Sequence, residues 1–238
     1  MTEPQEPDGG AAPPVRERLF QGSGAGLAGL LFAVLFIVGF VILDQIPDSA
    51  TTDELTAYYQ GASGSAVIVA GFYLVPFSGL AFLWFIAAAR HRLRSLARRE
   101  DPLLDTVQIT AGVLFVAMIF VAAAAAVTGV SAVRLTPSDA TADLVTLEQA
   151  STMTNYAQML LMTYAFRTAG VFILASTTRG LRAKLFPRWF AVLSYLAVAV
   201  LLLSLTSVRA VVLVVPLWVA AAAGVILFRR ATGQLEVA

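Results

Sequence analysis

Six long apolar segments, separated by short polar ones, follow one another along the chain. About 20 residues at about 1.5 Å rise each cross a hydrocarbon core of about 30 Å as an α-helix. We therefore expect six membrane-spanning helices, at 25–46, 64–89, 105–129, 152–177, 189–205 and 211–228. The predicted fold is an all-α, polytopic membrane bundle with its transmembrane domain at 21–230, between a disordered tail at 1–20 and a short tail at 231–238.

Two of the polar connections are long enough to form short helices. In the first, Thr51 and Glu54 fit a capping box and Gly61 fits a helix stop. In the second, Ser138 fits an N-cap. Apolar residues fall on one face in each connection, namely Leu55, Tyr58 and Tyr59 in the first and Leu144 and Leu147 in the second. These patterns predict two short interfacial helices on the extracellular side.

The basic residues gather on one side of the six-helix arrangement, and only Arg134 and Arg209 fall on the other side. By the positive-inside rule, both termini lie in the cytoplasm of a bacterial cell, and the protein is in its plasma membrane. The bilayer is therefore a partner. Anionic lipid headgroups are expected near the arginines of the basic loops: Arg90, Arg92, Arg94, Arg98, Arg99, Arg179, Arg182 and Arg188.

Composition supports a membrane protein and excludes several classes of function. The chain is 58% hydrophobic and 13% charged, whereas soluble domains carry about 25% charged residues. A net charge of +1 implies no nucleic-acid partner. Cysteine is absent and histidine occurs once, which excludes disulfides and thiolate or His-rich metal sites. We expect no cofactor and no enzyme activity, because HExxH, GxSxG and phosphate-loop motifs are missing.

Two glycine patterns occur in the first span. Gly24, Gly26 and Gly29 spell GxGxxG, but no strand precedes them, so we interpret that match as chance. The pairs Gly22/Gly26 and Ala25/Gly29 also give small-xxx-small spacing, which lets a neighbouring helix approach closely, either in the same chain or in a second copy of a homo-oligomer.

Arg167 is the one permanent charge well inside an apolar span. Such charges usually mark function or a buried pairing, and a guanidinium keeps its proton and needs acceptors. One candidate set of partners is Asp105 with Gln108 and Thr110; the other is the carbonyls freed by Pro76, with Ser78, Tyr164 and neighbouring Thr168. Arg167 then either locks helix packing or binds an anion. At the opposite side, Asp44 is expected to pair with Arg134 or Arg209.

A weak internal repeat accompanies this pattern. Thr52, Glu54, Leu55 and Gln60 match Thr141, Asp143, Leu144 and Gln149 at a constant offset, and each set precedes a span that ends in basic residues. This pattern predicts two parallel repeats, each a pair of helices that crosses the membrane outward and then back, as in some transporters.

Several sequence stretches also resemble a known group of proteins. These are DELTAYYQ, a GFYL…FLWF span that ends in RHRLR, and LFPRWFAVLSYLAV. Together they resemble uncharacterised integral membrane proteins from actinobacteria, and the layout is loosely similar to that of DUF4386-type membrane proteins. The resemblance implies a multi-pass bacterial plasma-membrane protein and transfers no catalytic or binding residue.

Two functions fit these observations. The first is a non-enzymatic protein that organises, senses or makes contacts in the membrane. The alternative is a small oligomeric transporter or channel that handles an anionic or amphiphilic ligand at Arg167. A cavity that reaches Arg167 would favour transport, and a dry bundle with Arg167 paired would favour the first function.

Overall fold

The computed structural model describes residues 15–45, 52–96, 101–135, 140–203 and 209–231. Within these ranges all regular structure is helical, and no strand occurs among them. The elements in chain order are α1 (Val15–Leu43), α2 (Thr52–Gln60), α3 (Ala62–Val69), the π-helical η1 (Ala70–Leu74), α4 (Val75–Leu96), α5 (Pro102–Leu135), α6 (Ala140–Met159), the π-helical η2 (Leu160–Ala165), α7 (Phe166–Arg182), α8 (Arg188–Leu203), the 3₁₀-helical η3 (Arg209–Leu213) and α9 (Val214–Ala231). The helix α1 begins inside the predicted tail.

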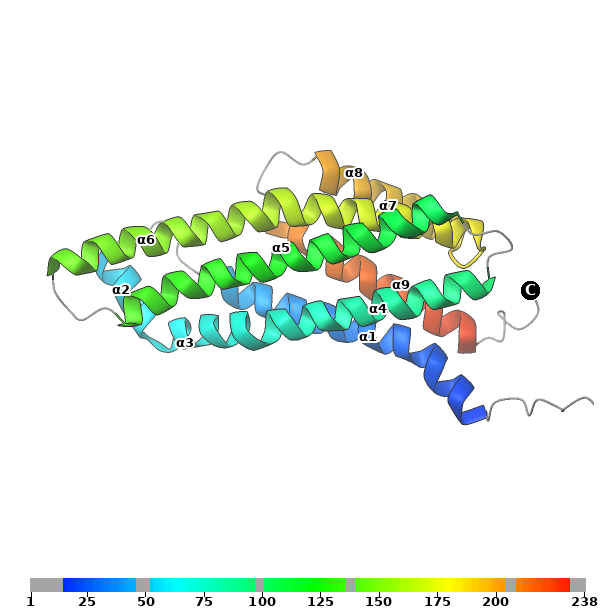
Figure 1. The fold of residues 1–238 in the computed structure, drawn as a ribbon, viewed down its shortest axis with the longest axis horizontal. Coiled ribbons are helices and arrows are strands. Elements are labelled where there is room, and N and C mark those ends of the chain that lie inside the picture. The colour runs from blue at the N-terminus through cyan, green and yellow to red at the C-terminus, as the bar shows by residue number, and fades with distance from the viewer. Residues whose placement is uncertain (1–14, 46–51, 97–100, 136–139, 204–208, 232–238) are drawn as a thin grey trace, which may run out of the picture.

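Within the described residues, five helical stretches are long and apolar enough to cross a membrane. They are Gly24–Leu43, Ala62–Arg94, Pro102–Arg134, Glu148–Arg182 and Val211–Phe228. They run side by side along the long axis of the molecule (Figure 1). The all-helical bundle is thus as predicted, and five of the six expected spans have the length that a membrane requires.

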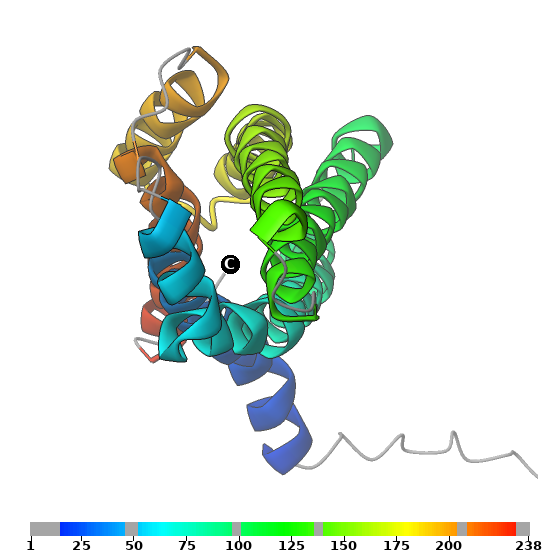
Figure 2. The ribbon, with the colours of Figure 1, turned by 90° about the vertical axis from the view of Figure 1, so that its left-hand side faces the viewer.

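The sixth expected span is α8, an apolar helix of 16 residues. At about 1.5 Å per residue it is about 24 Å long, which is short for a hydrocarbon core of about 30 Å. It lies at the periphery of the bundle (Figure 2). Ser194 of α8 accepts a hydrogen bond of 2.8 Å from the indole Nε1 of Trp218, and this bond ties α8 to α9.

A cluster of aromatic rings fills the middle of the bundle. The side chains of Phe32, Phe82, Phe115 and Phe172 are completely buried. The ring of Phe82 lies 4.7 Å from that of Phe32, 5.2 Å from Phe115 and 5.0 Å from Phe172, measured between centroids. Because lipid tails are as apolar as these rings, the cluster holds the helices together through close packing rather than through exclusion from water.

Small residues on α1 let two neighbouring helices approach it closely. A Cβ atom at Gly26 would lie 2.4 Å from Cγ of Leu227 in α9, and one at Gly29 would lie 2.9 Å from Cδ2 of Phe85 in α4. The small-xxx-small spacing therefore serves packing within one chain.

One end of the bundle extends beyond the rest. The helices α5 and α6 continue past the ends of α1, α8 and α9 (Figure 1). With 34 residues, α5 is about 51 Å long, about 20 Å more than a hydrocarbon core needs. We call this end, formed by α2 and the adjoining parts of α5 and α6, the cap end. The opposite end, which carries Arg90, Arg94 and Arg179, is the arginine end.

The predicted first short helix is present as α2, and it ends just before Gly61 as expected. Part of its predicted apolar face packs within the protein. The side chain of Tyr59 is 1% exposed and belongs to a small core with Val67, Val130, Val133 and Ala150. Tyr59 thus holds α2 against α3 and α5, while the interfacial position of α2 stays a prediction.

The predicted second short helix is wrong, because α6 continues without a break through η2 into α7. The internal repeat explains the difference. Gly61 and Gly64 of the first repeat correspond to Ala150 and Met153 of the second. A Cβ atom at Gly64 would lie 2.0 Å from the carbonyl oxygen of Tyr59, so the turn between α2 and α3 needs glycine there. Ala150 and Met153 favour a continuous helix instead.

Arg134 at the end of α5 holds α2 in place. Its Nε donates to the carbonyl oxygen of Tyr59 at 2.8 Å, and one terminal nitrogen donates to the carbonyl of Gly61 at 2.6 Å and to Oγ of Ser65 at 2.9 Å. The last carbonyls of a helix have no hydrogen-bond donor within the helix, and Arg134 supplies one. Its positive charge also lies at the negative end of the helix dipole. Arg134 therefore bonds to the end of α2. The other partner predicted for Asp44, Arg209, has no described side chain, so that pairing stays a prediction.

Replacing Arg134 with glutamine is expected to loosen α2 without disturbing the arginine end. Hydrogen bonds to charged groups contribute about 1.5–3 kcal/mol, and the partial exposure of Arg134 favours the lower value. Hydrogen exchange at the amides of Tyr59 and Gln60 should accelerate about tenfold, since about 1.4 kcal/mol corresponds to that factor. The Arg182→Gln variant, which removes an exposed arginine at the other end, is the control. Unchanged exchange in α2 would contradict this role.

Candidate functional site

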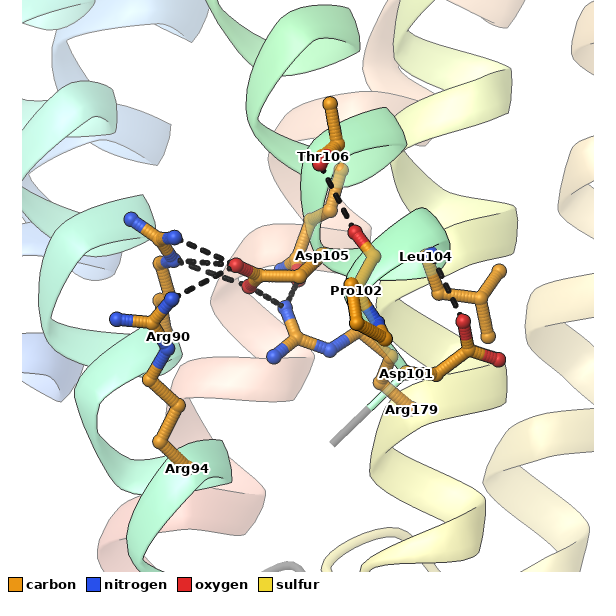
Figure 3. Close-up of polar contacts among 9 residues, drawn as sticks. Arg90, Arg94, Asp101, Pro102, Leu104, Asp105, Thr106 and Arg179 are labelled. Carbon is orange, nitrogen blue, oxygen red and sulfur yellow. Dashed lines mark hydrogen bonds and ion pairs between the residues drawn. The ribbon is translucent and has the colours of Figure 1, made fainter. Parts of the chain in front are cut away.

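The carboxylate of Asp105 binds three arginines at the arginine end (Figure 3). Arg90 donates to it through Nε at 3.0 Å to each oxygen and through a terminal nitrogen at 2.5 Å. Arg94 reaches Oδ2 at 3.0 Å, and Arg179 reaches Oδ1 at 2.6 Å. One side chain of α5 thereby joins α4 and α7, which come from the two halves of the chain.

Burial differs sharply among these partners. The side chains of Asp105 and Arg179 are 7% and 8% exposed, whereas those of Arg90 and Arg94 are 32% and 43% exposed. Arg179 also donates to the amide oxygen of Gln108, which is itself buried. The Asp105–Arg179 pair is thus the desolvated part of the cluster. Its stability depends on every hydrogen bond being made, because an uncompensated charge at such a site is costly.

The start of α5 fixes the position of Asp105. Pro102 occupies the first turn, where its missing N–H is harmless, and Asp101 accepts a hydrogen bond from the amide of Leu104 at 3.3 Å. Asp101 also accepts one from Arg182 at 2.7 Å. The backbone amide of Leu104 and the guanidinium of Arg182 lower the pKa of Asp101 below its usual value. Capping and ion pairing thus place the first turn of α5 beside α7.

Several features recur at the 89-residue spacing of the predicted repeat or within one residue of it. Arg179 follows Arg90 by 89 residues, and the two converge on the same carboxylate. Phe172 follows Phe82 by 90 residues, and their rings are in contact. The π-helical segments η1 and η2 begin 90 residues apart. Asp105 and the aromatic cluster therefore lie between α4 and α7, which belong to the two segments that the predicted repeat relates.

Arg167 does not join Asp105 and Gln108, so that predicted set of partners is wrong. Its guanidinium donates to the carbonyl oxygen of Thr163 at 2.5 Å, and its side chain is half-buried. Twelve residues separate it from Arg179, which is about 18 Å along a helix and too far to reach Asp105. Thr163 belongs to η2, where the π-helical turn displaces carbonyls from the usual hydrogen-bond ladder.

The other predicted site residues lie apart from one another. Ser78 is buried and donates to the carbonyl of Val75, while Thr168 donates to that of Ala165. Tyr164 and Thr110 are exposed on the surface of the bundle. Pro76 lies two residues after the end of η1, so its missing N–H falls beside a π-helical turn. Among the described residues, none of these forms a hydrogen bond with Arg167.

A cavity of about 400 Å³ lies between α1, α5, α6 and η2, on the cap-end side of the aromatic cluster. Its walls are mostly apolar. Four polar residues, Asp44, Thr154, Asn155 and Gln158, lie toward the cap end, while Phe36, Val75 and Ile119 lie deeper. Thr163 is part of the lining, but Arg167 is not. The volume falls within the range of about 300–1,000 Å³ that is typical of small-molecule sites.

The sequence predictions missed the roles of Arg90, Arg94 and Arg179, which were expected to face lipid headgroups. Arg179 is buried, and Arg90 and Arg94 bind Asp105, whereas Arg182 and Arg188 are exposed. Arg98, Arg99 and the predicted partner Arg209 have no described side chain. A signal was available, because extending the offset of the internal repeat aligns Arg90 with Arg179.

In comparisons with known proteins, no family model, no curated protein and no solved structure matches this chain.

Proposed function

We propose that the protein is a non-enzymatic membrane protein that organises or senses at the membrane, and that it is not a transporter or channel. The observation that carries this proposal is the filled interface between the two repeats. In transporters built from repeats, the substrate site lies near the middle of the membrane at that interface. Here the same region contains fully buried phenylalanine rings, with the Asp105 cluster next to them.

The position of Arg167 supports the same conclusion. An anion carried through the bundle would need the guanidinium to face a cavity. Arg167 instead bonds to a carbonyl of its own helical stretch, and it is absent from the lining of the 400 Å³ cavity. The cap end offers surfaces for recognition: α2 is fixed by Arg134, and Glu54, Gln60, Glu148 and Gln149 are exposed there.

The proposal includes an orientation in a bacterial plasma membrane, with the arginine end in the cytoplasm. The exposed basic residues Arg182, Lys184 and Arg188 lie at that end, and the positive-inside rule places them in the cytoplasm. Because the chain has no cysteine, single cysteines report the orientation directly. In intact cells an impermeant maleimide should label Ser63→Cys at the cap end and leave His91→Cys unlabelled; the reverse pattern would reject this orientation.

Flux through reconstituted vesicles tests the proposal against transport. Vesicles of phosphatidylethanolamine and phosphatidylglycerol are loaded with chloride or with a fluorescent carboxylate, and release is followed over time. We expect wild-type protein to give no more release than protein-free vesicles. The matched pair of variants is Arg167→Gln and Arg182→Gln, which remove a membrane-embedded and an exposed arginine from the same helix. Flux by the wild type that only Arg167→Gln abolishes would establish the transport alternative.

A further inference from the structure

The cavity between α1 and α6 extends through one half of the membrane thickness. Its deep end is lined by Phe36, Ile119 and Thr163, each of which lies close to the middle of its own membrane-length apolar stretch. Its shallow end is lined by Leu43, the last residue of the apolar stretch of α1. Leu43 follows Phe36 by seven residues, or about 10 Å along a helix, and half of a hydrocarbon core measures about 15 Å. The cavity thus has the depth of one leaflet.

The aromatic cluster closes the deep end of the cavity. The ring centroid of Phe36 lies 5.3 Å from that of Phe32 and 6.2 Å from that of Phe115. Phe36 is itself buried, and the other two rings are completely buried. A ligand that enters from the cap end therefore stops against these rings near the middle of the membrane. This shape suits a chain that belongs to the cap-end leaflet and does not form a path across the bilayer.

The cavity opens sideways along α6. Asn155 and Met159 lie one turn apart on this helix, and both line the cavity and are exposed. On the facing helix, Phe40 and Leu43 are half-buried. Because α1 packs on α4 and α9 while α6 packs on α5, the cavity separates α1 from α6. Met159 belongs to a membrane-length apolar stretch, so the medium at this opening is lipid hydrocarbon.

The walls suit a flexible hydrocarbon chain. Ala122 and Ala126 of α5 have short side chains that leave room on one wall. Leu161 and Met162 of the π-helical η2 form part of another wall, and single π-helical turns occur often at functional sites. Met159 and Met162 are flexible and polarizable, so they adapt to ligands of varied shape. An alkyl chain needs no directional partner, and mostly apolar walls are sufficient to hold it.

We propose that this cavity binds one acyl chain of a phospholipid from the cap-end leaflet. The chain enters between α1 and α6 past Met159, lies along Ala126 and Met162, and ends against Phe36. The head group stays outside the cavity, near Asn155. This site rests on the proposed function, since a protein that senses the membrane needs a place where a lipid acts on its packing, and here the chain separates α1 from α6.

Native mass spectrometry of the detergent-solubilised protein tests whether the chain has a site. Phosphatidylcholine is the probe, because its head group carries no net charge and the arginine end does not select it. We expect one molecule to bind the wild type, and Ala126→Phe, which places a ring in the cavity, to weaken this binding by about tenfold or more. Ala124→Phe makes the same change at an exposed position of α5 and should bind as the wild type does.

The same titration separates the chain from the head group. Lysophosphatidylcholine, which has one chain, should compete with phosphatidylcholine, whereas glycerophosphocholine, which has none, should not. Dodecanol that binds where phosphatidylcholine does not would assign the cavity to a free amphiphile and overturn the lipid source. Equal binding of phosphatidylcholine by Ala126→Phe and Ala124→Phe would overturn the site. If Ala126→Phe does not fold, Met162→Trp fills the cavity from η2 and takes its place.

Photolabelling locates the bound chain. In nanodiscs of phosphatidylcholine that carries a diazirine at the end of one acyl chain, we expect crosslinks to Phe36 or Ile119, which are 5% and 2% exposed and are shielded from bulk lipid. These crosslinks should be lost in Ala126→Phe and kept in Ala124→Phe. Crosslinks confined to outward-facing residues such as Val121 would contradict the proposal. Absence of binding without any vesicle flux would reject the ligand alone, whereas flux would reject the proposed function itself.

Discussion

Asp105→Asn is expected to lower the free energy of unfolding by about 3–5 kcal/mol, the range observed when one partner of a buried ion pair is removed. Among the described residues, the carboxylate of Asp105 is the only anionic group that pairs with Arg179, whose side chain is 8% exposed. Asparagine keeps the size of the side chain and removes its charge. Unfolding measured in detergent micelles by circular dichroism checks this value.

The partners of Asp105 should differ in the effect of their removal. We expect Arg179→Gln to be strongly destabilising and Arg94→Gln to change stability by about 0–1 kcal/mol, because Arg94 is 43% exposed. The double variant Asp105→Asn with Arg179→Gln should be less destabilised than the sum of the two single changes. Asp101→Asn, an exposed carboxylate one turn away, is the control. A similar loss in both aspartate variants would reject the special role of Asp105.

The spans were predictable from the sequence because each depends on local hydropathy. The predicted segment 211–228 agrees with the observed apolar stretch Val211–Phe228. Helix ends and breaks were harder to predict, because tertiary contacts decide them. No local signal shows that α5 continues to Leu135 and packs against α2, since Tyr59 becomes buried only after α5 and α6 have come together. For α8, local hydropathy predicted the helix but not its length: the helix of 16 residues is shorter than a membrane span requires.

The site was harder to predict than the fold, because a charge deep in an apolar span attracts more attention than a charge at the end of one. Arg167 stands out in the sequence, yet its acceptor is a carbonyl of η2, and a π-helical turn has no sequence signature. Arg179 looked like an ordinary topogenic arginine at the end of a span. Its role depends on Asp105 from the neighbouring helix and on Gln108 one turn further along. Only the repeat spacing, which pairs it with Arg90, distinguished it from Arg182.

Phe82→Ala is expected to lower the free energy of unfolding by about 3 kcal/mol. This is the lower end of the range of about 3–5 kcal/mol for buried phenylalanine in soluble cores. The lower value applies because lipid is as apolar as the ring, so mainly close packing is lost. Phe82 is completely buried and contacts the rings of Phe32, Phe115 and Phe172. The same detergent unfolding experiment measures the change.

Phe77→Ala removes the same ring from an exposed position of the same helix and should change stability little. A double-mutant cycle between Phe82 and Phe172 should give a coupling of about 0.5–1.5 kcal/mol, the value for a pair of aromatic rings in edge contact. Because the two rings belong to α4 and α7, which come from the two halves of the chain, this coupling measures how firmly the halves are joined. A cycle with no coupling, or equal losses at Phe77 and Phe82, would mean that the aromatic cluster does not hold the two halves together.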